Sequence, residues 1–413
     1  MKNFLKSLLL IAVCLQAASA SNGSAYSRYG VGEPSVFSTS RAAALGATGL
    51  ALAAEGYINQ DNPATLGTVT RTLFNGGYQY RGYGATDGTT SSYLNSGGFL
   101  NASFAFPVYK PYGIVFALGF SPVTNVGYYF NLKETHPRAG TIEQSFDGRG
   151  GLSALRMSLS YAPAADLYFG MTADYAFGTI RAEQALNYPN STFFASQVTR
   201  TSSIHGFTFR GGALYTGIDR ALGLSTTKHL SLGLTVLAGG SLSTNEEDLI
   251  HLSTVDTTVL RPDGTVKIPV GAGFGLAYQN AGKVYTADVQ MQQWGDFTRS
   301  GVHPSELQNS LRAGAGIEWM PSRDFTASYW QQTAYRLGAY AQKTNVYLNG
   351  ASINEYFATA GIGLPLGNDA RVNLGLEYGI RGTTSSSLIK NNIIRFTLSI
   401  SAGDVWFIQS EVE

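Results

Sequence analysis

The side chains best able to do chemistry in this 413-residue chain are its histidines, its serines and a single cysteine. The five histidines are His136, His205, His229, His251 and His303. None forms the i, i+4 pair that places two imidazoles on one metal ion. His205 lies near Ser202 and Ser203, but that proximity is too common in a serine-rich chain to indicate catalysis. No G-x-S-x-G motif and no P-loop occurs. The sequence therefore predicts no catalytic residue, no metal, no cofactor and no enzyme activity.

Charged residues that alternate with apolar neighbours are the better candidates. They are Arg156, Asp174, Arg312, Glu318, Glu377 and Arg381. Because successive side chains of a strand point to opposite faces, these charges face inward where their neighbours face lipid. They could form ion pairs that hold an internal segment to the wall, or a polar path for the head group of a ligand. The first interpretation is favoured, since any filled barrel must pair such groups.

Long strands must position these charges, and alternation with a period of two predominates from Thr70 onward. Fourteen strand cores are expected, an even number as in bacterial single-chain barrels. They span 70–82, 97–107, 112–131, 140–162, 166–182, 200–216, 229–245, 266–279, 283–292, 309–320, 324–333, 353–364, 371–381 and 390–402. Long polar loops are expected at 83–96, 183–199, 246–265, 293–308 and 334–352. The other connections are short except for 217–228, as periplasmic turns and extracellular loops would be.

Composition separates a membrane barrel from a soluble β-protein, which could show the same alternation. Charged residues make up only 13% of the chain, about half the usual share of a soluble domain. The 49 glycines suit a crowded interior, and aromatic residues gather at strand ends as an interfacial girdle requires. We therefore expect an all-β fold, a 14-stranded antiparallel transmembrane β-barrel. With a net charge of +1 and no basic tract, no nucleic-acid partner is expected.

The N-terminus has the pattern of a secretory signal peptide over residues 1–20. Lys2 and Lys6 form its charged region, an apolar run follows, and Ala18-Ser19-Ala20 is a cleavage site. A lipoprotein signal at Cys14 is disfavoured because Val13 stands where a small residue is needed. Cleavage after Ala20 leaves no cysteine, and thus no disulfide.

The segment between the signal and the first strand is rich in alanine and glycine, so it cannot build a core alone. Asn62-Pro63-Ala64 ends it, because proline fixes φ and pushes Asn62 toward extended geometry. The Asn62 side chain is expected to cap nearby amides. We interpret residues 21–68 as a hatch inside the lumen, 69–407 as the barrel and 408–413 as a short periplasmic tail.

This arrangement resembles the FadL/TodX family of outer-membrane transport proteins. The resemblance rests on hatch residues in two motifs, Ser40-Arg41-Ala42-Ala43-Ala44-Leu45-Gly46 and Asn62-Pro63-Ala64. Two later stretches, Gln293-Trp294-Gly295-Asp296-Phe297 and Gly403-Asp404-Val405-Trp406-Phe407, resemble the branch found in Bacteroidetes and Chlorobi. The similarity covers essentially the whole mature chain, and Asn-Pro-Ala after a small-residue segment is its most specific element.

The resemblance implies an outer-membrane location in a Gram-negative bacterium, with the bilayer and its lipopolysaccharide as partners. It implies hatch-controlled passage of a hydrophobic or amphipathic small molecule, of long-chain fatty acid or aromatic hydrocarbon type, through an apolar cavity and a lateral opening. Such a ligand, or detergent, would lie in the lumen. One departure is that no external loop contains a long amphipathic helical hairpin.

The alternative is a non-transporting barrel that serves as a scaffold or accessory subunit of an outer-membrane secretion or assembly complex, with other outer-membrane proteins as partners. An apolar pocket beside the hatch with a break in the wall would support transport. A filled lumen and an apolar patch on the loops or outer wall would support the scaffold.

Overall fold

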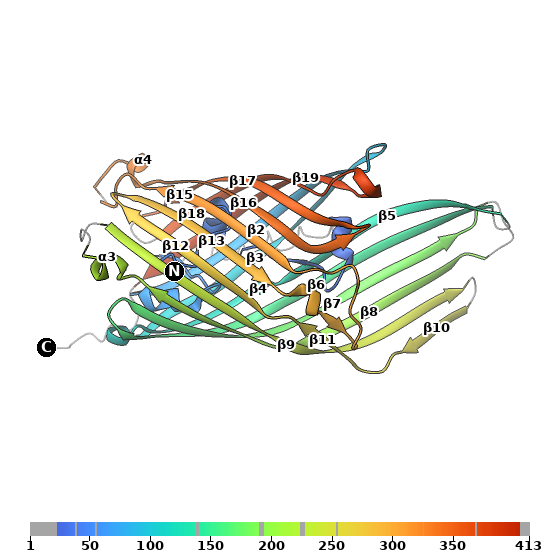
Figure 1. Cartoon of the computed structure of the whole chain (residues 1–413), viewed down its shortest axis with the longest axis horizontal. Coiled ribbons are helices and arrows are strands. Elements are labelled where there is room, and N and C mark those ends of the chain that lie inside the picture. The colour runs from blue at the N-terminus through green and yellow to red at the C-terminus, as the bar shows by residue number, and fades with distance from the viewer. Residues whose placement is uncertain are drawn as a thin grey trace, which may run out of the picture.

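The computed structural model describes residues 23–37, 39–53, 56–137, 140–189, 194–223, 228–252, 255–324, 326–367 and 370–404. They form a closed, 14-stranded antiparallel β-barrel, as the sequence predicts (Figure 1). The last strand pairs with the first long strand from Lys390↔Thr86 to Asp404↔Thr72, which closes the ring. The predicted signal peptide and the predicted tail lie outside the described residues.

At several of the fourteen positions in the wall, two or three short strands lie end to end in place of one continuous strand. The wall consists of β2 (Thr72–Thr86), β3 (Ser91–Tyr109), β4 (Ile114–Pro122) continued by β5 (Thr124–His136), β6 (Gly140–Ala164), β7 (Leu167–Asn187), β8 (Ser196–Tyr215), β9 (Lys228–Leu252), then β10 (Val255–Leu260), β11 (Gly264–Ile268) and β12 (Gly271–Asn280) in line, β13 (Lys283–Gln292) continued by β14 (Thr298–Arg299), β15 (Ser310–Trp319), β16 (Ala334–Leu348), β17 (Ala351–Pro365), β18 (Ala370–Arg381) and β19 (Lys390–Asp404).

The remaining elements are short. They are η1 (Ala25–Arg28), β1 (Glu33–Pro34), α2 (Ser40–Ala44), η2 (Pro63–Thr68), η3 (Lys110–Tyr112), α3 (Ile218–Ala221), η4 (Trp294–Asp296), α4 (Tyr329–Gln332) and η5 (Ser385–Ser387). None of the helices among the described residues is long and apolar enough to cross a membrane.

The prediction of a strand at 324–333 and a loop at 334–352 is wrong. Within 324–333 lies the helical turn α4, which Ser328 and Gln331 stabilise by a reciprocal capping box. The strand is instead β16, which runs on to Leu348, and Asn349-Gly350 forms the tight turn to β17 with φ values of 50° and 80°. The polar side chains of this stretch face the barrel interior. The stretch therefore has the polar composition of an exposed loop although it is a strand.

The predicted loops at 83–96, 183–199 and 246–265 are also largely strand. Strands β2, β3 and β7 to β10 continue through these stretches, so that β5 to β10 project beyond the rest of the barrel (Figure 1). Polar residues occupy both faces there, which removes the alternation that marks a strand. In this projection the guanidinium of Arg200, together with that of Arg261, holds the pKa of Asp248 at about 2 against the opposing effect of burial.

The wall alternates as predicted, with large apolar side chains outside. On β6, Leu155, Met157 and Leu159 are each more than 40% exposed, whereas Arg156 and Ser158 are buried between them. The apolar residues that are buried inside form five clusters. Each cluster contains at least one residue from 23–69, namely Val31, Phe37, Ile58, Leu45 and Tyr26 in turn. The N-terminal part of the chain therefore packs into each of the five buried apolar clusters that the described residues form.

Candidate functional site

Residues 23–68 contact strands on opposite sides of the barrel. The helix α2 packs on β16 to β19, η2 packs on β4 and β6 to β8, and β1 pairs with β5. In Figure 1 this segment, in blue, lies among the wall strands. We refer to residues 23–68 as the N-terminal segment. Whether it works as a separate hatch domain remains a prediction.

The first motif of the segment packs its backbone directly against the wall. Thr39 caps α2 by accepting a hydrogen bond from the Ala42 amide, and Ser40 and Leu45 are fully buried. Gly46 has a φ of 67°, and a β-carbon there would lie 2.4 Å from the Ala315 carbonyl oxygen. Glycines of the wall allow this approach, since β-carbons at Gly316 or Gly338 would also meet segment backbone at 2.4 Å.

The second motif forms the cap that the sequence predicts. The Asn62 side chain accepts a hydrogen bond from the Ala64 amide at 3.1 Å, with Pro63 at the first position of η2. Its amide nitrogen donates to the Leu50 carbonyl at 2.7 Å and to the Ala213 carbonyl of β8 at 3.1 Å. Asn62 thus links two parts of the segment to the wall.

Glu318 anchors α2 to β15 and β16. Arg41 donates to both of its oxygens, at 3.0 and 2.7 Å, and Arg336 donates to it at 2.6 Å. Arg336 also donates to the Tyr57 hydroxyl at 2.8 Å, and the Arg41 guanidinium lies 4.5 Å from the Tyr57 ring centre. Glu318 and Arg336 are buried and Arg41 is largely buried, so one carboxylate here balances two guanidinium groups.

Glu33 anchors the strand β1 in a second buried cluster. Arg381 donates to both of its oxygens, and Arg395 donates to it at 3.3 Å. Each arginine also has a carboxylate from the wall, because Arg381 pairs with Glu355 at 2.7 Å and Arg395 with Glu377 at 3.5 Å. If Glu33 were lost, Arg381 and Arg395 would therefore each still have a carboxylate partner in the wall.

Of the other predicted inward charges, Arg156 and Asp174 face each other across β6 and β7. Their side chains lie 3.6 Å apart, and Arg156 lies equally far from Asp61 of the segment. Arg210 approaches the same Asp61 oxygen at 3.2 Å. Arg312 differs, since it faces a cavity with Gln290 and Gln342 as its cross-strand neighbours.

The six predicted inward charges thus fall into separate clusters, and the sequence reading missed most of their partners. These partners are Glu33, Asp61, Arg336, Glu355 and Arg395, and Asp61 has Arg210 as a second partner. Arg336 was missed because β16 was taken for a loop. Arg210, Glu355 and Arg395 stand at alternating strand positions, a signal that could have identified them. Glu33 and Asp61 stand beside Pro34 and Asn62, which could have marked them as anchors of the segment.

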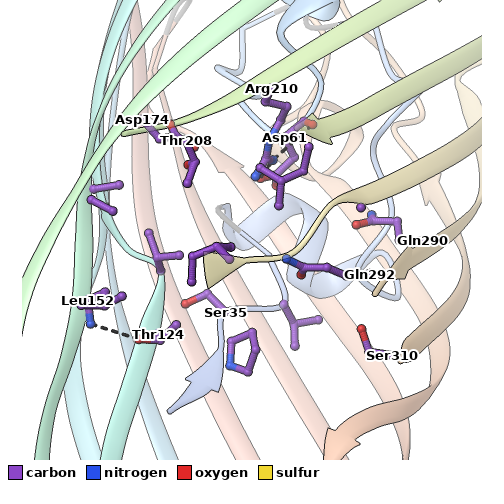
Figure 2. Close-up of a pocket in the computed structure, with 18 of the residues that line it drawn as sticks. Ser35, Asp61, Thr124, Leu152, Asp174, Thr208, Arg210, Gln290, Gln292 and Ser310 are labelled. Atoms are coloured by element: carbon purple, nitrogen blue, oxygen red, sulfur yellow. Dashed lines mark hydrogen bonds and ion pairs between the residues drawn. The ribbon is translucent and has the colours of Figure 1, made fainter. Parts of the chain in front are cut away.

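A cavity of about 210 Å³ lies between the segment and β6 to β15. Figure 2 shows Asp61 and Arg210 at one end, Ser35 of the segment beside Thr124, and Gln290, Gln292 and Ser310 on the opposite side. Apolar side chains such as Leu237 and Trp294 line another part. The lining is therefore mixed rather than the apolar pocket expected for a hydrocarbon. Among the described residues no group of three or more His, Cys, Asp or Glu could hold a metal ion.

The wall is interrupted beside this cavity. Strand β3 pairs with β4 only from Ala102 to Tyr109, and within the described strands nothing pairs with that side of Ser91–Asn101. The cause is a bend at Pro122-Val123, where proline offers no amide hydrogen and β4 gives way to β5. Opposite the bend, Gly150 and Gly151 of β6 have φ values of 114° and 135°. We call the interval between Ser91–Asn101 and β5 the seam.

The N-terminal segment occupies the β5 side of the seam. Glu33 and Pro34 pair with Asn125 and Thr124, and the Gly23 amide donates to the Gly127 carbonyl at 2.8 Å. Pro34–Phe37 line both the cavity described above and a much smaller one that reaches Phe99 and Leu100 of β3. A route from the lumen to the seam would therefore require Pro34–Phe37 to move.

Solved structures of hydrocarbon channels share this fold. The toluene transporter TbuX of Ralstonia pickettii matches with 14% identity and a TM-score of 0.59, covering 88% of this chain and 97% of its own. A FadL homologue of Pseudomonas aeruginosa gives 14% identity, a TM-score of 0.58 and coverages of 90% and 99%. The P. putida toluene transporter TodX matches with 16% identity and a TM-score of 0.57, covering 89% of this chain and 98% of its own. At such identities the likeness establishes the fold alone.

Sequence comparison identifies a family whose name differs from those of these solved channels. No curated protein matches the chain. A family model described as BamG matches residues 1–413, which is the entire chain.

Proposed function

Because the chain belongs to the BamG family, we propose that it is a non-conducting accessory subunit of an outer-membrane protein complex in a Gram-negative bacterium. Its outer wall carries large exposed apolar side chains and its fold is that of outer-membrane channels, which supports the location. The observation that carries the proposal is the filled interior. The N-terminal segment takes part in every buried apolar cluster and in both principal ion-pair networks.

A filled interior of this kind suits a rigid support better than a passage. Paired, buried charges hold the segment at Glu318 and Glu33, and opening the lumen would break several of these contacts at once. The cavity that remains is small and lined by ion-paired side chains such as Asp61 and Arg210. A hydrophobic solute would gain little from it.

Depletion of the protein in its own host tests this proposal. We expect lower amounts of other folded, heat-modifiable outer-membrane barrels, and unchanged uptake of toluene and long-chain fatty acid. Re-expression of the full chain is the control. Normal levels of all other barrels combined with lost uptake would contradict the proposal and favour transport.

Transport of a hydrophobic or amphipathic small molecule is a second candidate, and the seam specifically favours it. A break in the wall beside a lumen cavity is what lateral release into the bilayer needs, and Pro34–Phe37 stands between the two. A disulfide from Ser35→Cys to Val123→Cys, positions whose backbones are hydrogen-bonded at 2.8 Å, would lock that stretch. Reversible loss of uptake on oxidation would support this second function.

The orientation of the barrel gives a further prediction. Gly350 and Gly367 lie in turns at opposite ends, each has a positive φ, and neither has a neighbour that a β-carbon would meet within 4 Å. We expect a membrane-impermeant maleimide to label Gly350→Cys on intact cells but Gly367→Cys only after lysis. Each variant is the matched control of the other, because the strain on substitution is alike. The reverse labelling would invert the proposed topology.

A further inference from the structure

The outer wall of β13 to β17 carries small side chains where the rest of the barrel carries large ones. Seven outward positions, contiguous in the strand register, are alanine: Ala287, Ala313, Ala315, Ala339, Ala341, Ala358 and Ala360. This patch lies directly behind the strip where Gly46 meets the wall from inside. At Gly314, Gly316 and Gly338 the inner face carries no side chain, so the backbone of the N-terminal segment lies directly against the backbone of the wall.

A groove of about 740 Å³ lies on the outside at the edge of this patch, and Ala360 is the one of the seven alanines that lines it. The register places Leu337, Ala360, Leu376 and Phe396 side by side on four strands, with Ala360 as the low point between larger neighbours. Leu337 is 61% exposed and Leu376 46%, so they stand as walls on either side. The floor presents almost no hydrogen-bonding group, which makes the groove fit a hydrocarbon chain.

The mouth of the groove has a different character. Lys283, Trp319 and Tyr335 form one cross-strand row at its end, beside the short turns of the barrel. The Trp319 and Tyr335 rings lie 5.8 Å apart. A cation beside two such aromatics is typical of a membrane–water boundary, where an anionic head group meets an acyl chain.

We infer that this groove binds one anionic phospholipid of the periplasmic leaflet, with its phosphate at Lys283 and an acyl chain in the apolar groove over Ala360. The inference rests on the outer-membrane location proposed above. The charge at the mouth selects the anionic head group, and the apolar floor accepts its chain.

Quenching of Trp319 fluorescence tests this site. The purified full chain is reconstituted in phosphatidylcholine vesicles that contain brominated phosphatidylglycerol or brominated phosphatidylcholine. Subtraction of the Trp319→Phe signal isolates Trp319 from the other tryptophans. We expect brominated phosphatidylglycerol to quench at a mole fraction about fivefold lower than brominated phosphatidylcholine, as expected for one lysine near an anionic head group.

Two substitutions and a matched control complete the experiment. Lys283→Gln is expected to abolish the preference for phosphatidylglycerol, and Ala360→Phe to reduce quenching by both lipids because it fills the groove. Lys343→Gln, which removes an exposed lysine from the far end of β16, should change neither. Equal quenching by the two lipids in the full chain, or an equal effect of Lys283→Gln and Lys343→Gln, would overturn the inference.

The alternative occupant is a protein partner, and it gives a separate result. A photocrosslinking amino acid at position 360 in native membranes should yield lipid adducts, whereas a protein adduct would overturn the inference. The depletion experiment tests the accessory function, and the vesicle measurement tests the lipid site. A negative result in the first would not change the result of the second, so the two proposals can fail independently.

Discussion

Deletion of residues 27–60 is expected to give a barrel that still folds but conducts ions steadily across a planar bilayer, where the full chain is silent. The deletion removes the residues that the segment contributes to most buried clusters, including Val31, Phe37, Leu45 and Ile58. Water would fill the vacated space, since many inward wall side chains there are polar or charged, such as Arg156, Asp174 and Glu318.

The barrel should survive because its wall charges stay paired among themselves. Without the segment, four buried pairs within the wall remain: Arg156 with Asp174, Arg336 with Glu318, Arg381 with Glu355, and Arg395 with Glu377. The strand ladders that close the ring from β2 round to β19 join wall strands to one another, and the deletion removes the two-residue pairing of β1 with β5. Heat-modifiability on a gel reports folding, and single-channel recording reports conductance. A folded but silent deletion protein would show that wall side chains, not the segment, seal the lumen.

Glu318→Gln should produce the largest loss of stability of any single substitution in the ion-pair networks. Glu318 is the one carboxylate within 4 Å of both Arg41 and Arg336 among the described ion pairs, and Glu318 and Arg336 are buried while Arg41 is largely buried. Removal of its charge leaves two buried guanidinium groups uncompensated, which costs about 3–5 kcal/mol. The temperature at which the heat-modifiable band shifts measures the effect, and protease cleavage within residues 23–68 reports release of the segment.

Glu33→Gln is the matched control, because it also removes a buried carboxylate that bridges two arginines. Here Arg381 and Arg395 keep Glu355 and Glu377, so the loss should be less than half of that for Glu318→Gln. Equal losses in the two variants would mean that the arginines do not depend on these particular carboxylates.

The strand count and the inward charges could be predicted from the sequence because alternation reports which face meets an apolar environment. The prediction fails where that contrast disappears. Strand β16 was missed because its inward residues are polar and its outward residues include small alanines, so that neither face is plainly apolar. The projecting ends of β7 to β10 were taken for loops because both of their faces are polar.

The candidate site was only partly predictable for a different reason. Asn62 could be identified as a cap because a cap is local, and its contact with Ala64 spans two residues. The partners of Arg41 and Glu33 are separated from them by 277 and 348 residues, and no local pattern records such distances. The seam was equally hidden, since Pro122 indicates a bend but not which neighbouring strand loses its partner.

Those long separations have a consequence for the order of assembly. The N-terminal segment is the first part of the mature chain to be made, yet Glu33 must wait for Arg381 and Arg395, which lie on the last two strands. Contacts of such high sequence separation form late, because the intervening chain must first be organised. The segment therefore remains without its anchors until the final strands arrive. Ring closure and sealing of the lumen then become one event, and an unfinished barrel is also an unsealed one.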